Sequence, residues 1–232
     1  MLCVQQLSVT GRRDHLLPAT SLQAARGELL LVAGSRQDQR TALALTLSGR
    51  MKPSSGSIGW DGSARIKFLR KAASVVDSPG VNEPEQHLSV RDLVTEDLAL
   101  VPRRHRGALR STPWLKLNNF DDIAGLWTEQ LPAHRRIELL TALALTNPDT
   151  GLLVVDSPDR HSGDAADWLP WLEYLAHDAG RPLAVVATVT RLPDGWSGPA
   201  AMIGNAAPQA DEPLPAETLL PETLLSETED AK

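Results

Sequence analysis

The sequence predicts an α/β fold, in which the strands of a core sheet alternate with helices that flank it. Three continuous apolar runs have the length of strands buried on both faces, as in parallel sheets: Leu29–Ala33, Leu152–Val155 and Leu183–Thr188. A polar turn that opens on Gly34 follows the first run and leads into a stretch with helical composition, Thr41–Leu47. A strand, a glycine turn and a helix in this order form the arrangement in which phosphate-binding loops occur.

Composition narrows the class of protein. A chain of 232 residues that is 42% hydrophobic fits one α/β domain with an appendage. Cys3 is the only cysteine, which excludes an intramolecular disulfide and a cysteine-rich metal site. The chain shows no signal segment and no apolar run that approaches the length of a membrane span. We therefore expect a cytoplasmic protein that reaches a membrane only through a partner.

The net charge of −6 comes from the C-terminal end of the chain. From Asp211 onward, seven acids face Lys232 alone, so the rest of the chain is close to neutral and gives no indication of a nucleic-acid partner. Residues from about Ala206 are rich in Pro and Glu and have no periodic apolar face. The sequence thus predicts an ordered domain over residues 1–205 and a disordered acidic tail over 206–232.

Weaker patterns supply the remaining elements. They predict strands at Cys3–Val9, Pro18–Gln23 and Ala73–Val76, a mainly helical stretch at Leu88–Leu145, and a helix at Asp164–Asp178. A basic run, Val101–Arg110, interrupts the helical stretch, and Pro170 lies within the last helix. After Pro193 the patterning decays.

The most specific motif follows the first helix. Leu47–Gly62 fits the pattern L-x-G-x-x-x-P-x-x-G-x-I-x-x-x-G, with matches at Gly49, Pro53, Gly56, Ile58 and Gly62. This segment resembles the one after the P-loop helix in the nucleotide-binding domains of ATP-binding cassette (ABC) transporters, which are P-loop ATPases. In that family it leads into a small antiparallel β subdomain.

Four further segments agree with the resemblance in order and spacing. They are a Gly-Glu turn at Arg26–Glu28, a segment similar to L-T-V-x-E-x-L at His87–Leu93, the helix after the signature motif at Arg136–Pro148, and a Walker B strand at Leu152–Pro158. The resemblance implies a P-loop NTPase-like ABC fold. That fold has a mixed core sheet with flanking helices, a small antiparallel β subdomain, and a helical subdomain at about residues 78–146.

The P-loop itself is degenerate. A loop of the form G-x-x-x-x-G-K-S/T needs glycines so that successive N–H groups can turn toward phosphate oxygens. Here Gly34 and Thr41 are kept, and Arg40 retains a cation at the lysine position. Gln39 stands where the last glycine belongs, and Gln37 occupies another position usually given to glycine. By the resemblance, Gly34, Arg40 and Thr41 are the residues that remain for nucleotide binding.

Asp38 opposes phosphate directly. A carboxylate ~4 Å from a phosphate oxygen would repel it by up to roughly 4 kcal/mol at an effective dielectric constant of about 20, unless Arg40 pairs with it. The sequence therefore argues against tight ATP binding and leaves weak Mg-ATP binding open. If nucleotide binds, Thr41 and Asp156 would be the ligands of Mg²⁺.

The other catalytic positions are also replaced. Ser157 stands where the family has the glutamate that polarises the attacking water. Asp77 occupies the glutamine-loop position, and Val189 that of the switch histidine, where valine can neither take a proton nor bond a phosphate. The stretch Gln130–Arg135, at the position of the L-S-G-G-Q signature, has no serine or glycine. We expect no catalytic residue in this chain.

These observations predict a degenerate ABC-type nucleotide-binding subunit that is not an enzyme. It would be a structural or regulatory component of a transporter-like complex, peripheral at the cytoplasmic face of the membrane. The expected partners are integral membrane subunits, together with a second copy or an intact ABC ATPase. Docking would involve the basic run of the helical subdomain: Arg103, Arg104, His105, Arg106 and Arg110. Two alternatives stay open, namely a functional transport ATPase working in a heterodimer and a stand-alone interaction module.

Overall fold

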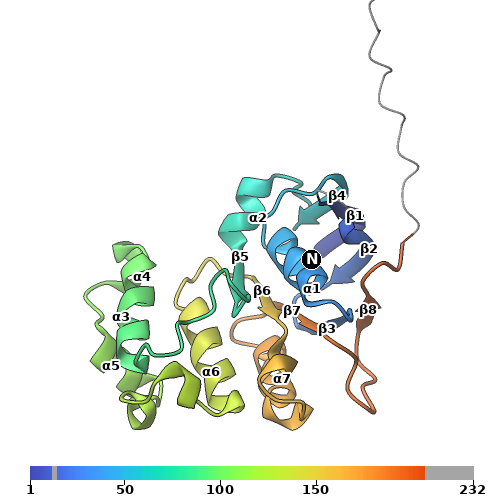
Figure 1. Cartoon of the computed structure of the whole chain (residues 1–232). Coiled ribbons are helices and arrows are strands. Elements are labelled where there is room, and N and C mark those ends of the chain that lie inside the picture. The colour runs from blue at the N-terminus through green and yellow to red at the C-terminus, as the bar shows by residue number, and fades with distance from the viewer. Residues whose placement is uncertain (12–14, 207–232) are drawn as a thin grey trace, which may run out of the picture.

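The computed structural model describes residues 1–11 and 15–206, and it confirms the α/β fold class. Two sheets form the core (Figure 1). The larger is parallel and contains, in spatial order, β5 (Ala73–Val76), β6 (Leu152–Asp156), β7 (Ala184–Val189), β3 (Glu28–Ala33) and β8 (Ala200–Met202). The smaller is antiparallel, in the order β2 (His15–Ala24), β1 (Leu2–Thr10) and β4 (Ser55–Trp60).

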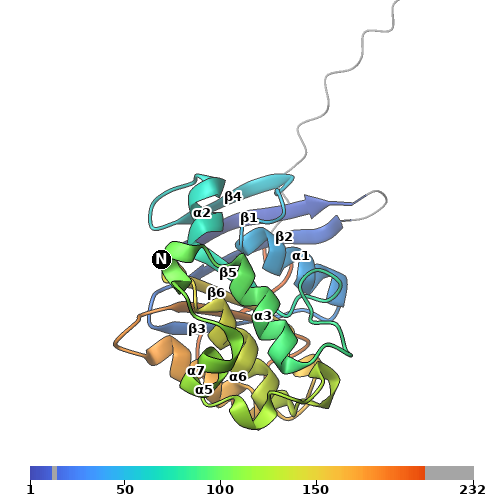
Figure 2. The ribbon, with the colours of Figure 1, turned by 90° about the vertical axis from the view of Figure 1, so that its left-hand side faces the viewer.

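Helices cover both faces of the parallel sheet. In chain order they are α1 (Gln37–Leu47), α2 (Ile66–Ala72), α3 (Val90–Leu100), α4 (Arg103–Arg106), α5 (Ser111–Leu117), α6 (Ala133–Ala144) and α7 (Leu169–His177). Single 3₁₀ turns lie at Asp121–Ile123, Thr128–Gln130, Pro158–Arg160 and Ala165–Asp167. Helix α1 lies between the two sheets, whereas α6 and α7 cover the other face (Figure 1). Helices α3, α4 and α5, here called the helical lobe, stand beside α6 at the β5 side (Figure 2).

The alternation of side chains along β3 shows why the predicted strands are continuously apolar. Leu30 and Val32 pack with α1 and the antiparallel sheet, whereas Leu29 and Leu31 pack with α6 and α7. A strand buried on both faces needs apolar residues at every position, since no face is left for water.

The glycines of the most specific motif have a backbone role. Gly49, Gly56 and Gly62 have φ of 72°, 78° and 78°, in the region that favours glycine. At Gly56 a Cβ would lie 2.3 Å from the carbonyl oxygen of Gln6, because β4 pairs with β1 there, at a register shift between Gln5 and Ser8. The fixed spacing of the motif therefore follows from the turns on either side of β4 and from the close approach of Gly56 to β1.

Several elements differ from the sequence prediction. The basic run is not a simple interruption, because Arg103–Arg106 forms α4. Pro170 lies in the first turn of α7, which starts at Leu169, because proline is tolerated where the N–H needs no helical partner. Helix α2 and strand β8 were not predicted. The proposed tail falls almost entirely on residues 207–232, outside the described residues.

Candidate functional site

The parallel sheet brings the predicted site positions to one edge. Gly34 follows β3, Asp156 ends β6, Val189 ends β7, and Asp77 follows β5. The carboxyl ends of parallel strands are where α/β folds place their ligand sites. The contacts of these residues decide whether this edge of the sheet can bind a ligand.

Arg40 turns into the protein. Its guanidinium donates hydrogen bonds to the carbonyl oxygen of Gly34 (2.6 Å), to Oε1 of Gln37 (2.6 Å) and to Oγ of Ser157 (2.9 Å). The residue is only 5% exposed. The cation at the lysine position is thus held by the loop itself and by the end of β6.

Gln37 fills the position between the two proposed ligands of Mg²⁺. Its Nε2 lies 3.1 Å from Oγ1 of Thr41, 3.3 Å from Oδ1 of Asp156 and 2.9 Å from Oγ of Ser157. An amide N–H donor satisfies the same lone pairs that a cation would need. This bridging role was missed by the sequence reasoning, which noted Gln37 only as a lost glycine.

Asp38 pairs with Arg36 and not with Arg40, so the pairing that could have offset its repulsion of phosphate does not form. Its two oxygens accept from Arg36, at 3.1 Å and 2.6 Å, and Oδ1 also accepts from the N–H of Gln39 at 3.0 Å. Arg36 lowers the pKa of Asp38 against a small opposing effect of burial, so the carboxylate is charged at neutral pH. The first turn of α1, where a phosphate would bind, thus carries a carboxylate of the chain.

The remaining catalytic positions are buried and internally bonded. Oγ of Ser157 donates to Oδ1 of Asp156 at 2.8 Å, and that oxygen also accepts from Oγ1 of Thr188 at 3.1 Å. Val189 is fully buried, and its carbonyl oxygen accepts from the N–H of Gly34 at 2.9 Å. Oδ2 of Asp156 is buried without a hydrogen-bond partner among the described residues.

These contacts do not fit Mg-ATP. The cation that would meet the phosphates is engaged inside, an amide lies between the metal-ligand positions, and a charged carboxylate occupies the first turn of α1. Nucleotide binding would have to break these bonds, and leaving buried polar groups without partners costs about 1–3 kcal/mol each.

Asp77 belongs to a second polar cluster, here called the Asp77 cluster. Its carboxylate accepts two bonds from Arg136, at 2.8 Å and 3.0 Å, and lies 2.8 Å from Nη2 of Arg160 and 2.8 Å from Nε2 of His161. Burial raises the pKa of Asp77, but the bonds from His161 and Arg136 and the charges of Arg136 and Arg160 outweigh burial and hold that pKa well below its usual range. Asp77 is therefore a buried carboxylate that stays ionised.

A groove of about 290 Å³ lies next to this cluster. Its walls are the end of β5, the following loop and Arg50 on one side, and α3, the two residues after it and α6 on the other. Asp97 lines it without a hydrogen bond or ion pair among the described residues, and burial together with Glu96 raises the pKa of Asp97. Leu100, at its mouth, is 81% exposed. We call this the β5–α3 groove.

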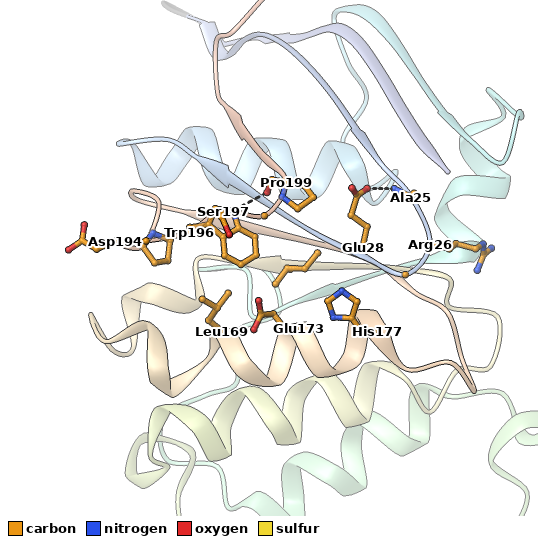
Figure 3. Close-up of a pocket in the computed structure, with 15 residues that line it drawn as sticks. Ala25, Arg26, Glu28, Leu169, Glu173, His177, Asp194, Trp196, Ser197 and Pro199 are labelled. Carbon is orange, nitrogen blue, oxygen red and sulfur yellow. Dashed lines mark hydrogen bonds between the residues drawn. The ribbon is translucent and has the colours of Figure 1, made fainter.

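A larger cavity, about 720 Å³, lies at the opposite end of β3 from the loop (Figure 3). It lies at the start of β3, between α7 and residues 193–199, where Leu169 and Glu173 face Trp196 and His177 lies below Glu28. Because β3 carries the loop at its other end, this cavity cannot serve the predicted site. No group of His, Cys, Asp and Glu in the described part of the chain could hold a metal ion.

Comparison with solved structures identifies the fold as that of ABC ATP-binding subunits. CbiO1 of Clostridium perfringens, part of the ABC transporter complex CbiONQ, matches with a TM-score of 0.58 and 20% identity over 82% of this chain and 78% of its own. A bacterial ABC transporter cassette solved as a dimer matches with a TM-score of 0.59 and 18% identity, covering 82% of this chain and 88% of its own. A nucleotide-free cassette from an ABC transporter matches with a TM-score of 0.63 and 12% identity, covering 83% and 82%.

Matches at this level of identity define the fold. No protein-family model matches the sequence, and no curated protein matches it. Within residues 1–11 and 15–206, no helix has the length and apolar character needed to cross a membrane.

Proposed function

We propose that the protein is a catalytically inactive ABC-type nucleotide-binding subunit, a structural or regulatory component of a membrane transporter-like complex. It would be peripheral at the cytoplasmic face of the membrane and bind integral membrane subunits. A second copy of the chain or an intact ABC ATPase would complete the pair of nucleotide-binding subunits.

One observation carries the inactivity: the contacts of Gln37 and Arg40 with the end of β6. Gln37 bridges Thr41 and Asp156, and Arg40 bonds Ser157, so the P-loop positions and the Walker B positions satisfy one another. Apart from Oδ2 of Asp156, the side chains of this site bond to one another and not to a ligand. With Ser157 and Val189 at the glutamate and switch-histidine positions, neither position carries a base for the attacking water.

The β5–α3 groove supports the binding of a partner. It combines an apolar rim at Leu100 with an unpaired carboxylate at Asp97, and α4 adds Arg103 and Arg104 nearby. A partner helix that carries apolar residues and one basic side chain would satisfy Asp97 and cover Leu100.

One observation favours the alternative, a functional ATPase in a heterodimer. Oδ2 of Asp156 is buried without a partner among the described residues, and an orphaned carboxylate oxygen suits a cation. In that case the partner would supply the missing base, and the Gln37 bridge would have to open.

Phosphate release by the purified chain at millimolar Mg-ATP tests the inactivity. The proposal expects a rate equal to that of Asp156→Asn. Turnover that Asp156→Asn abolishes would establish the functional ATPase instead.

Detergent pull-down from native membranes tests the complex. The proposal expects an integral membrane protein to co-purify with the chain. Recovery of the chain alone, wholly in the soluble fraction, would favour the stand-alone interaction module.

A further inference from the structure

The Asp77 cluster connects parts of the chain that have separate roles. Asp77 directly follows β5 of the core sheet, Arg136 lies in the first turns of α6, and Arg160 and His161 follow β6. Arg160 also reaches Glu83, with 3.0 Å between Nη1 and Oε1. Glu83 belongs to the loop that leads from β5 to α3, so the ion pairs extend from the core to the entry of the helical lobe.

The same loop is fixed at further points. Asn82 donates from its side chain to the carbonyl oxygen of Val75 at 2.8 Å and accepts from the N–H of Ser78 at 2.8 Å. Arg160 donates to the carbonyl oxygen of Asp77 at 2.9 Å. The loop is therefore folded back on β5 by contacts that all lie within the chain.

The backbone conformation of Asp77 shows that more contacts hold this residue in place than one ion pair would supply. Asp77 has φ of 60°, a conformation that costs energy for a residue other than glycine, and it is only 4% exposed. Such a residue persists only where its surroundings hold it, and here Arg136, Arg160 and His161 all do so. Removing one partner of a buried ion pair leaves an uncompensated charge, so each ion pair of the Asp77 cluster depends on the others.

The Asp77 cluster also borders the β5–α3 groove, which Asp77 itself lines. Asp77 and Asn82 belong to the core-side wall of the β5–α3 groove, whereas Leu93 and Asp97 of α3 belong to the opposite wall. Fixing the loop from Asp77 to Glu83 therefore fixes the distance between the two walls.

We propose that the Asp77 cluster is a permanent clamp, which holds the helical lobe in one orientation and keeps the β5–α3 groove formed without nucleotide. The proposal rests on the function proposed above, because it explains how an inactive subunit offers a constant docking surface. The clamp makes the groove independent of the P-loop, since none of the hydrogen bonds and ion pairs of Asp77 among the described residues reaches Gly34, Arg40 or Thr41.

Hydrogen exchange of the purified full chain, read by mass spectrometry, tests the clamp. Asp77→Gln places a longer, neutral side chain where three cationic or donor groups meet. We expect the amides of residues 78–100 to exchange about tenfold faster or more, while those of β3 and β6 keep their protection. Unchanged exchange over residues 78–100 in a folded Asp77→Gln protein would overturn the clamp.

Two further variants separate a local effect from general destabilisation. Glu83→Gln removes only the ion pair between Glu83 and Arg160, and it should speed exchange in residues 78–89 alone. Arg135→Gln removes the positive charge next to Arg136. It loses the bonds to Asp122, Glu138 and the carbonyl of Asn119 and the contact of the guanidinium with the ring of Phe120, all outside residues 78–100, so it should leave exchange over residues 78–100 unchanged. Equal acceleration by Arg135→Gln and Asp77→Gln would show that the lobe is merely unstable.

Nucleotide provides the last comparison. Adding millimolar Mg-ATP to the unaltered chain should leave exchange over residues 78–100 as it was, and a nucleotide-dependent change there would contradict a permanent clamp. The outcome is distinct from the pull-down: a clamp without a membrane partner would leave this proposal standing and remove the transporter-like role.

Discussion

Nε of Arg40 donates a hydrogen bond of 2.9 Å to Oγ of Ser157, so the two residues that the resemblance assigns to the P-loop lysine position and to the catalytic glutamate position are bonded to each other. The two replacements are thus physically related. A glutamate at position 157 would bring a second carboxylate next to Asp156. A lysine at position 40 carries all its donors on one nitrogen, so it could not reach the three acceptors that Arg40 meets with three separate nitrogens. The pair of substitutions joins the loop to β6 in place of a ligand.

Restoring the loop should raise the affinity for ATP. The variant Gln37→Gly, Asp38→Ala, Gln39→Gly and Arg40→Lys removes the bridge, the carboxylate and the internal guanidinium together. We expect ATP to bind about tenfold more tightly or more in isothermal calorimetry, with a lower thermal midpoint because the bonds to Ser157 and Gly34 are lost.

Adding Asp156→Ala to that variant provides the control, since the gain in Mg-ATP affinity should shrink when the retained acid is removed. Micromolar ATP binding by the unaltered chain would contradict the view that its own side chains close the site.

The glycines of the motif around β4 should differ in their tolerance of a methyl group. Gly56→Ala places a Cβ against the backbone of Gln6 at a φ of 78°, and we expect a loss of about 3 kcal/mol or more in the free energy of unfolding. Gly62→Ala has the same φ with open space around it, so about 1 kcal/mol is expected. Urea unfolding measures both, and equal losses would show that φ alone explains the motif.

Elements set by neighbouring residues in the sequence were predicted, whereas elements that depend on contacts between distant residues were missed. The strands Leu29–Ala33 and Leu152–Val155 were predicted because burial on both faces is written into consecutive residues. Strand β8 was missed because Ala200–Met202 becomes a strand only through pairing with β3, about 170 residues earlier in the chain.

The site shows the same division. Motif spacing located Arg40, Asp77, Ser157 and Val189, but it could not show what each contacts. Arg160 and His161 went unrecognised as partners of Asp77, because a sequence does not tell which of its many bases meets a buried acid. The available signal was only that an acid directly after a buried strand needs a partner.

Stability should fall in acid because of Asp77. This carboxylate faces Arg136, Arg160 and His161, with Glu83 across Arg160, and its pKa in the folded chain lies below the ordinary value of 3.8. A lowered folded pKa stabilises the protein above the unfolded pKa, and the contribution is lost as pH falls below about 4 toward the folded pKa. Urea midpoints measured from pH 7 down to pH 2 should follow this loss.

Asp77→Asn checks the assignment. It should lower stability at pH 7 by about 3–5 kcal/mol, since it leaves buried cations without their counter-charge, and it should flatten the slope below pH 4. Asp61→Asn is the matched control, because that acid pairs with Arg26 and with the N-terminal amine at the surface and should change stability by about 1 kcal/mol or less. An unaltered acid slope in Asp77→Asn would assign the pH dependence to other carboxylates.

The final prediction concerns Asp97, which should act in opposite directions in the free and the bound protein. Burial and Glu96 raise the pKa of Asp97, so its charged form destabilises the isolated chain at neutral pH. Asp97→Asn should therefore raise the thermal midpoint of the free chain by about 1–2 °C, a gain that a functional residue commonly gives up. In the membrane complex the same change should weaken binding, because the basic side chain that we propose opposite Asp97 loses its partner.

Charge reversal at Arg103, Arg104 and Arg106 on α4 is the comparison. If these arginines lie only at the rim of the interface, their effect on co-purification should vanish at high salt, whereas the effect of Asp97→Asn inside the groove should remain. A complex that forms equally well with Asp97→Asn at every salt concentration would place the docking surface elsewhere on the chain.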